Sequence, residues 1–146
     1  MRLYRVGLFT DVYFPNPNGV TTSVYLLLRE LRRMGHEAWV IAPAHPEAPE
    51  NEEGVARVPS VAYPFYEGQQ IALPSARHLP TEFELVHTHT PLTLGVWGLR
   101  IARNKNLPHV STFHTHYEKY AHYVPGLAFL DKYTGIVPRL AKAFYN

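Results

Sequence analysis

Two short histidine pairs are the residues in this sequence with the clearest capacity for chemistry. His87 and His89 form one His-x-His pair, and His114 and His116 form the other. Each pair stands at the end of an apolar run that is typical of a buried strand. Alternate side chains of an extended segment point the same way, so the two pairs could offer four imidazole nitrogens to a metal ion such as zinc. A metal centre is therefore one interpretation of these residues.

A second interpretation is that each histidine only hydrogen-bonds at the end of a strand and binds no ligand. Catalytic zinc sites usually include carboxylates or are oriented by them. In the sequence, only Asp11 and Glu118 lie near the predicted strand ends. The scarcity of carboxylates counts against the metal interpretation.

A loop that ends in Gly19 is the other candidate for chemistry. Residues 3–10 predict a buried strand, and residues 11–19 end it with two prolines and an Asn-Gly pair. The apolar residues that follow have helical spacing until Gly35, a residue typical of a helix end. A glycine at a helix start lets an anion such as phosphate reach free backbone N–H groups. Neither the dinucleotide fingerprint nor the P-loop motif is present, and an ordinary loop with Asn18 as the helix cap is the alternative.

The rest of the chain alternates predicted strands and helices. The predicted elements are strands at 37–42, 54–58, 83–87 and 109–113, a helix carrying Leu94, Trp97, Leu99 and Ile101, and a terminal helical segment within 127–146. This order predicts one α/β domain over residues 1–146, an open doubly wound, Rossmann-like parallel sheet with helices on both faces. Ligands of such sheets bind at the carboxyl ends of the strands. The loop 11–19 and both histidine pairs should then share one edge and one pocket.

Two connecting segments are predicted to lack regular structure. Residues 43–54 combine three prolines with four glutamates and predict a solvated acidic loop. Residues 59–80 form a long irregular segment, and such segments within a compact domain are usually functional or mobile.

Composition excludes several classes of protein. The 146 residues contain no cysteine, so disulfides and thiolate metal sites are excluded. The net charge of +2 is small and the basic residues are scattered, which argues against a nucleic-acid partner. No apolar run approaches the roughly 20 residues that span a bilayer. The first strand starts too early for a signal peptide, so we expect a cytoplasmic protein.

Three stretches together resemble a known family. They are GLFTDVYFPNPNGVTTSVYLLLRELRRMGHEAWVIAP, FELVHTHTPLTLGVWGLRIARNKNLPHV and STFHTHYEKYAHYVPG. In this order and spacing they resemble the N-terminal half of a GT-B glycosyltransferase of glycosyltransferase family four. The resemblance is closest to the branch that makes glycolipids such as glucosyl- or galactosyl-diacylglycerol. Many family members carry two consecutive glycines where this chain has Asn18-Gly19.

The resemblance implies roles for particular residues. Gly19 would offer its backbone N–H to the donor diphosphate, and His114 would be the catalytic residue, hydrogen-bonding a hydroxyl of the transferred sugar. The residues implied to bind substrate on the acceptor side are Asp11, Tyr13, Gln69, His89, Thr115, Tyr117 and Tyr120.

The resemblance also implies the reaction and its partners. Such enzymes are retaining transferases that use a nucleotide-diphosphate sugar, here a UDP- or GDP-sugar, and need no tightly bound cofactor or metal. A lipid acceptor such as diacylglycerol is preferred over a soluble sugar. Aromatic residues at Tyr63, Phe65, Tyr66 and Tyr117, with cations such as Lys119, would suit peripheral contact with the inner face of a membrane, or would simply cover the core.

In this family, a second Rossmann-like domain makes most contacts with the nucleotide sugar, through residues that include paired glutamates. No such glutamate pair occurs in this sequence. We therefore expect the chain to be the acceptor-side half of the enzyme, without its C-terminal donor-binding domain and inactive alone.

Two functions from other classes remain open at this stage. A metal-dependent hydrolase would use His87, His89, His114 and His116. A non-catalytic, flavodoxin-like receiver module would need several carboxylates at its strand ends, and only Asp11 fits that pattern.

Overall fold

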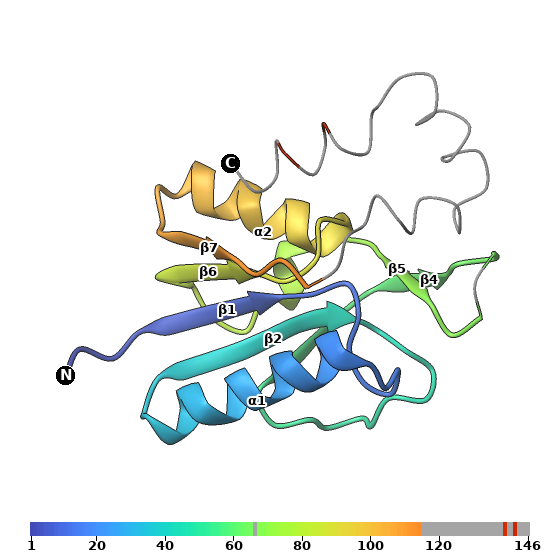
Figure 1. The fold of residues 1–146 in the computed structure, drawn as a ribbon, viewed down its shortest axis with the longest axis horizontal. Helices are drawn as coiled ribbons and strands as arrows, with labels where there is room; N and C mark the ends of the chain where they lie inside the picture. The colour runs from blue at the N-terminus through green and yellow to red at the C-terminus, as the bar shows by residue number, and fades with distance from the viewer. Residues whose placement is uncertain (66, 115–138, 140–141, 143–146) are drawn as a thin grey trace.

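The computed structural model describes residues 1–65, 67–114, 139 and 142. Its centre is a five-stranded parallel sheet with strand order β3-β2-β1-β6-β7 (Figure 1). The strands are β1 (Arg5–Phe9), β2 (Glu37–Pro43), β3 (Val55–Val58), β6 (Leu85–Thr88) and β7 (His109–Ser111). The chain winds outward from β1 in both directions, so the order reverses between β1 and β6. This confirms the predicted doubly wound sheet.

Two helices cover opposite faces of this sheet. Helix α1 (Gly19–Arg33) lies on one face and α2 (Thr93–Asn104) on the other (Figure 1). Helix α1 begins after Asn18, whose side chain accepts a hydrogen bond from the Thr21 N–H at 2.9 Å. It ends before Gly35, which has a φ of +91° that side chains rarely adopt. Both helix boundaries agree with the sequence prediction.

Each face of the sheet has its own apolar core. On the α1 side, Val24 and Leu28 pack among Val6, Leu8 and Val40. On the α2 side, the buried residues are Phe9, Ile41, Val58, Ala72, Phe83, Val86, Leu94 and Ala102. Because successive residues of a strand point to opposite faces, Leu8 and Phe9 belong to different cores. The helices are therefore held on the sheet independently of each other.

Phe9 occupies a slot that two glycines leave open. A Cβ at Gly98 of α2 would lie 2.8 Å from Phe9 Cγ, which is closer than real contacts allow. A Cβ at Gly7 would lie 2.8 Å from Phe9 Cε2 and 2.9 Å from Phe83 Cδ2. The aromatic ring also packs edge-on against Trp97 of α2 and against Phe83. Helix α2 thus approaches β1 closely because neither glycine carries a side chain.

The segment 59–80 is more regular than the sequence predicted. It contains an antiparallel pair, β4 (Ser60–Ala62) with β5 (Gln70–Ala72), and a short 3₁₀ helix, η1 (Ala76–His78). Strands of three residues are too short to give a clear periodic signal, which is why they were missed. The predicted terminal helix in 127–146 lies outside the described residues, apart from Arg139 and Lys142.

Candidate functional site at the carboxyl edge of the sheet

The loops after β1, β6 and β7 leave the sheet at the same edge. Strand β1 pairs in parallel with β6, and β6 pairs in parallel with β7, so their carboxyl ends coincide. The Asp11 N–H donates to Thr90 Oγ1 at 2.9 Å, and His89 Nδ1 lies 3.0 Å from His114 Nε2. Gly19 follows the same loop as Asp11 and starts α1 at this edge. The sheet pairing and these contacts therefore confirm that the three segments leave one edge of the sheet, whereas a single pocket shared by all three stays a prediction.

The start of α1 opens onto a cavity at this edge. It has a volume of about 410 Å³ and is lined by Val12, Asn16, Pro17, Asn18, Glu67, Gly68 and Gln69. A Cβ built at the neighbouring Gly19 would meet nothing within 4 Å. The first turn of the helix contains no acidic residue, and its leading N–H groups have no acceptors within the helix. This helix end can therefore accept an anion.

Asn16 joins the two sides of this cavity. The side-chain amide of Asn16 donates to the Gly68 carbonyl at 2.8 Å, while the backbone carbonyl of Asn16 accepts from Thr21 Oγ1 at 2.9 Å. The turn between β4 and β5 is thereby tied to the loop that precedes α1. Gln69, predicted to bind substrate, lies on this turn, is partly exposed and lines the cavity.

Asp11 has an internal role that the sequence did not indicate. Its carboxylate is 3% exposed and accepts hydrogen bonds from Thr90 Oγ1 at 2.6 Å and Thr93 Oγ1 at 2.6 Å. It also accepts from the N–H groups of Leu94 at 2.8 Å and Gly95 at 3.3 Å. Burial raises the pKa of the carboxyl, and these four donors oppose that rise. Asp11 therefore caps α2 from the loop after β1.

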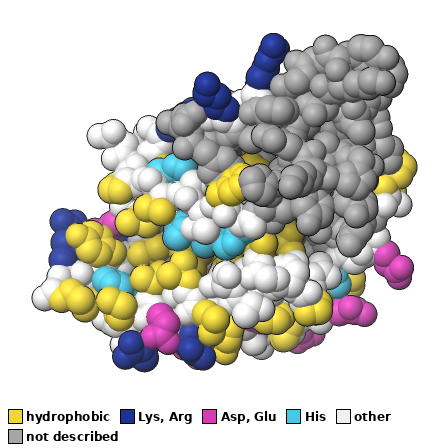
Figure 2. All heavy atoms as spheres, in the orientation of Figure 1, with side chains coloured by type: hydrophobic (Ala, Val, Ile, Leu, Met, Phe, Trp, Pro, Cys, Tyr) yellow, Lys and Arg dark blue, Asp and Glu magenta, His cyan; other side chains and the backbone are white. Residues whose placement is uncertain are grey.

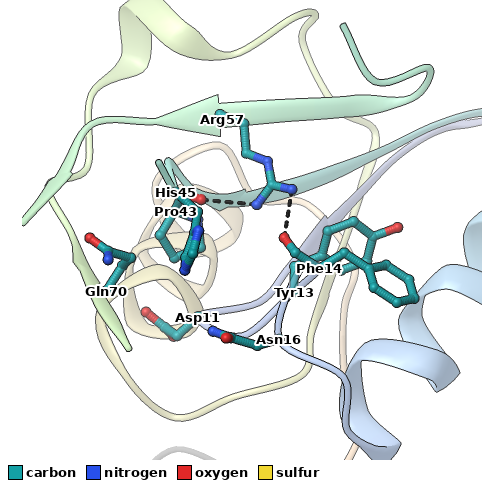
Figure 3. A pocket seen from close by; sticks show the side chains of 8 residues that line it. All are labelled: Asp11, Tyr13, Phe14, Asn16, Pro43, His45, Arg57 and Gln70. Carbon is teal, nitrogen blue, oxygen red and sulfur yellow. Dashed lines mark hydrogen bonds between the residues drawn. The ribbon is translucent and has the colours of Figure 1, made fainter. Parts of the chain in front are cut away.

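Arg57 on β3 holds the middle of the loop after β1. Its guanidinium donates to the carbonyls of Phe14 at 2.7 Å and Pro43 at 3.0 Å, drawn as dashed lines in Figure 3. It also pairs with Glu52 through Nε at 2.6 Å and Nη2 at 2.8 Å. The Glu52 side chain is only 14% exposed, so this one glutamate of the predicted solvated loop 43–54 is instead a partly buried ion-pair partner.

Tyr13 is buried beside this arginine. The ring is 5% exposed, and the guanidinium carbon of Arg57 lies 5.5 Å from its centroid. Burial raises the pKa of the phenol to about 12. The cavity that Tyr13 and Asp11 help to line has a volume of about 10 Å³, roughly that of one water molecule (Figure 3). Direct contact of Asp11 or Tyr13 with an acceptor stays a prediction, and this cavity is too small for a sugar.

Three of the predicted histidines lie together at the ends of β6 and β7. The rings of His87 and His89 stack with centroids 4.1 Å apart, and those of His89 and His114 lie 5.3 Å apart. His87 Nε2 is 2.6 Å from Thr112 Oγ1. His89 is 2% exposed, whereas His87 and His114 are partly exposed. On the face shown in Figure 2, histidine side chains reach the surface beside hydrophobic ones.

Burial keeps these imidazoles neutral. Burial, with a smaller contribution from neighbouring histidines, lowers the pKa of His87 to about 4 and that of His89 to about 3. Burial also lowers the pKa of His114. At neutral pH, each ring therefore carries one proton, and can donate one hydrogen bond and accept another.

The metal interpretation gains no support. Within residues 1–65 and 67–114, no group of three or more His, Cys, Asp or Glu side chains is placed to hold a metal ion. The histidine rings stack and hydrogen-bond to one another, whereas ligands would direct their nitrogens at a common point. His116 lies outside the described residues, as do the predicted substrate residues Thr115, Tyr117 and Tyr120.

Several polar residues that hold the site together were not predicted from the sequence. These are Thr90, Thr93, Asn16, Glu52 and Arg57. A signal existed for the first two, since Thr90-Pro91-x-Thr93 before an apolar helix is typical of a helix start. Asn16 and Arg57 also bind Gly68 and Phe14, on segments that the sequence alone does not bring together, whereas Glu52 pairs with Arg57 from a nearby position in the sequence.

The fold and the site define the class of the protein. A parallel, doubly wound sheet with helices on both faces is a Rossmann-like α/β domain, and domains of this class bind their ligands at the carboxyl edge of the sheet. Glycosyltransferase Family 4 matches the sequence over residues 17–145, and the chain belongs to this family. The family expected from the resemblance is thus confirmed.

Named relatives agree with this assignment. The chain is 35% identical over 126 residues to an alpha-monoglucosyldiacylglycerol synthase of Streptococcus pneumoniae, which covers 82% of this chain and 29% of the synthase. It is 36% identical over 121 residues to a GDP-mannose-dependent alpha-mannosyltransferase of Mycolicibacterium smegmatis, covering 76% and 32%. It is 30% identical over 122 residues to a phosphatidyl-myo-inositol mannosyltransferase of Mycobacterium leprae, covering 76% and 32%. The chain spans about a third of the length of these relatives, and none of them supports the hydrolase or receiver alternatives.

Proposed function

We propose that this chain is the N-terminal, acceptor-side domain of a retaining glycosyltransferase with a GT-B fold that takes its sugar from a nucleotide diphosphate. The observation that carries the proposal is the open start of α1 at Gly19, on the same sheet edge as His114. An anion site and a sugar-sized cavity beside neutral hydrogen-bonding groups are the features that such a transfer needs.

Gly19 is proposed to bind the donor diphosphate. Negative charge develops on the leaving nucleotide diphosphate as the sugar departs, and helix N–H groups that are already oriented stabilise it. With no side chain at Gly19, the phosphate can approach the backbone. No metal ion is required in this scheme, because the helix end supplies the positive potential.

His114 is proposed to hold a hydroxyl of the transferred sugar near the reaction centre. Its ring is partly exposed at the rim, and its lowered pKa keeps it neutral at physiological pH. A neutral imidazole can orient a hydroxyl without introducing charge, which helps to position the anomeric carbon for attack.

The proposed acceptor is a lipid such as diacylglycerol. Two of the relatives described above are named for lipid products or substrates, one containing diacylglycerol and one phosphatidylinositol. Exposed apolar side chains on this chain, including Phe65, Leu73 and Leu92, would suit peripheral contact with the inner face of a membrane. Among the described residues, no helix is long and apolar enough to cross one. Sedimentation with anionic and zwitterionic vesicles tests this part, and equal absence of binding to both would remove the membrane contact.

The diphosphate site is tested with a Gly19→Val variant. We expect the added side chain to occupy the path of the phosphate and weaken binding of UDP or GDP by roughly tenfold or more, while the fold tolerates it because nothing lies within 4 Å. The matched control is Ser23→Val, which adds the same side chain at an exposed position of the same helix. Titration calorimetry with both nucleotides is performed on a longer protein that contains this chain, because the second domain is implied to make most contacts with the nucleotide. The same titration distinguishes a UDP-sugar from a GDP-sugar enzyme. Equal nucleotide affinity in the two variants would contradict the assignment of Gly19.

A further inference from the structure

His89 is held on both sides and shut off from solvent. Its ring stacks on that of His87 with an angle of 27° between the planes, and its Nδ1 lies 3.0 Å from His114 Nε2. Its backbone N–H donates to the Phe9 carbonyl at 2.9 Å. The remaining ring nitrogen, Nε2, is buried and has no partner in the described part of the chain. His89 is 2% exposed, and among the described residues His114 is the partly exposed ring to which it is hydrogen-bonded.

The contact between the two rings requires one proton between His89 Nδ1 and His114 Nε2. Both rings are neutral, so there are two arrangements. In the first, His89 carries its proton on Nδ1 and donates a hydrogen bond to His114 Nε2, so the buried Nε2 of His89 is unprotonated and is an acceptor. In the second, His114 donates from Nε2, and His89 must carry its own proton on the buried Nε2.

The unpartnered nitrogen distinguishes these arrangements. A buried N–H without an acceptor is rare and unfavourable, whereas an acceptor that lacks one partner is tolerated better. The second arrangement leaves such an N–H on His89 Nε2, and the first does not. The first arrangement is therefore favoured, with His89 as the donor.

We propose that His89 is a positioning residue that fixes the tautomer of His114, so that His114 carries its proton on Nδ1 and presents that N–H to a hydroxyl oxygen of the bound sugar. The role toward the sugar rests on the proposed function, but the tautomer does not. His114 Nε2 is occupied by His89, so only Nδ1 is left to bind another group. Either nitrogen of a neutral imidazole can carry the proton. The contact with His89 places the proton of His114 on Nδ1, so this ring donates its hydrogen bond in one fixed direction.

The ring of His87, which stacks on that of His89, is also held in place by a polar contact. His87 Nε2 contacts Thr112 Oγ1 at 2.6 Å, and the Thr112 N–H donates to the Thr88 carbonyl at 2.9 Å. The stack is thus anchored to both β6 and β7, which keeps the plane of His89 aligned with His114.

The tautomers can be read directly from the 146-residue protein. Histidine side-chain ¹⁵N spectra at neutral pH report which ring nitrogen carries the proton. We expect the proton on Nδ1 in both His89 and His114. A proton on His89 Nε2 would overturn the proposal, and this readout does not depend on sugar transfer.

Two substitutions of His89 test the positioning role. His89→Asn keeps an N–H donor near the position of Nδ1, so the tautomer of His114 should be retained. His89→Leu removes the donor, so His114 should shift toward its Nε2–H form. The control is His78→Leu, the same substitution at an exposed histidine of η1, which should leave the tautomer of His114 unchanged. Retention of the His114 tautomer in His89→Leu would also overturn the proposal.

Kinetics in a longer protein that contains this chain and transfers sugar complete the test. His89→Leu should lower kcat by roughly 10- to 100-fold with little change in the donor KM, and His89→Asn should recover most of it. Equal kcat in wild type and His89→Leu would contradict the positioning role even if the tautomers are as expected. If the longer protein transfers no sugar from any nucleotide, the proposed function fails, and the ¹⁵N result still decides the tautomer.

Discussion

Asp11 shows how one buried carboxylate can join two distant parts of this chain. It follows β1 in the sequence, yet all four hydrogen bonds to its carboxylate come from Thr90 and the first turn of α2, about 80 residues later. Such a group acts as a helix cap and as a tether between loops at the same time. A buried carboxylate beside a possible ligand site is therefore not by itself evidence of contact with substrate.

We expect Asp11→Ala to lower the free energy of unfolding by about 3 kcal/mol, because two hydroxyls and two backbone N–H groups lose their acceptor. Asp11→Asn should cost less, since its remaining oxygen still accepts. Urea unfolding followed by circular dichroism measures both. The exposed Glu50→Ala is the control and should change stability by less than about 0.5 kcal/mol. A loss below about 1 kcal/mol in Asp11→Ala would show that the cap contributes little.

The buried histidines predict a loss of stability in acid. Their folded-state pKa values, about 4 for His87 and about 3 for His89, lie below the unfolded value of 6.5. The unfolded chain therefore binds more protons below pH 6.5, so their contribution is complete above that pH and falls as the pH drops toward 4 and 3. For the buried His89 alone, the loss by pH 5 is about 2 kcal/mol.

Urea unfolding at pH 7.5 and pH 5 checks this expectation. The raised pKa of Asp11 acts in the opposite direction at pH values above 3.8, the ordinary pKa of an aspartate, so it reduces the net slope. His89→Asn should remove the part of the slope that comes from His89. If the slope of stability against pH is the same in that variant as in wild type, the pKa of His89 does not differ between the folded and unfolded states.

Among the helices and strands, the long periodic elements were predictable and the short ones were not. The apolar spacing of α1, its Asn18 cap and its Gly35 end are local features that the sequence displays. Strands β4 and β5 exist through pairing with each other and through the Asn16 bond to Gly68. The hydrogen bonds from Arg57 to the carbonyls of Pro43 and Phe14 likewise form only when β3 lies beside β2 and near the loop after β1. Non-local contacts, and not propensity, determine these features.

Helix α2 depends on a glycine at its contact with β1. Gly98→Ala should destabilise the protein by about 1–3 kcal/mol, although alanine favours helices, because its Cβ would overlap Phe9. The control is Gly19→Ala, at the start of α1, where a Cβ meets nothing within 4 Å and stability should change little. Thermal unfolding of both variants tests the comparison, and a Gly98→Ala protein as stable as wild type would show that the helix can shift away from the strand.

Taken as a whole, the chain forms one wall of the proposed site. The edge of the sheet carries the α1 start and the histidines, while the relatives are about three times as long as the matched region. A transfer reaction needs donor, acceptor and catalytic groups enclosed together, away from water. The family was recognisable because three motifs occur in order, but the internal roles of Asp11, Tyr13 and His89 depend on burial, which a sequence pattern does not report.

We expect the purified 146-residue chain to transfer no sugar from UDP-glucose, UDP-galactose or GDP-mannose to diacylglycerol vesicles. The physical reason is that this wall alone leaves the nucleotide and the reacting carbon exposed. The measurement is incorporation of radiolabelled sugar into the lipid fraction, with a full-length relative as the positive control. Turnover above the no-enzyme background would refute the expectation and place the complete active site within these residues.

The slot around Phe9 has a consequence for the evolution of the family. Because Gly7 and Gly98 both leave space for one ring, the three positions cannot vary independently. Homologues with alanine or a larger residue at either glycine position should carry a smaller residue at position 9, and those that keep the phenyl ring should keep both glycines. Substitution histories at these three sites should therefore be correlated, although none of the three contributes a side chain to the proposed diphosphate site.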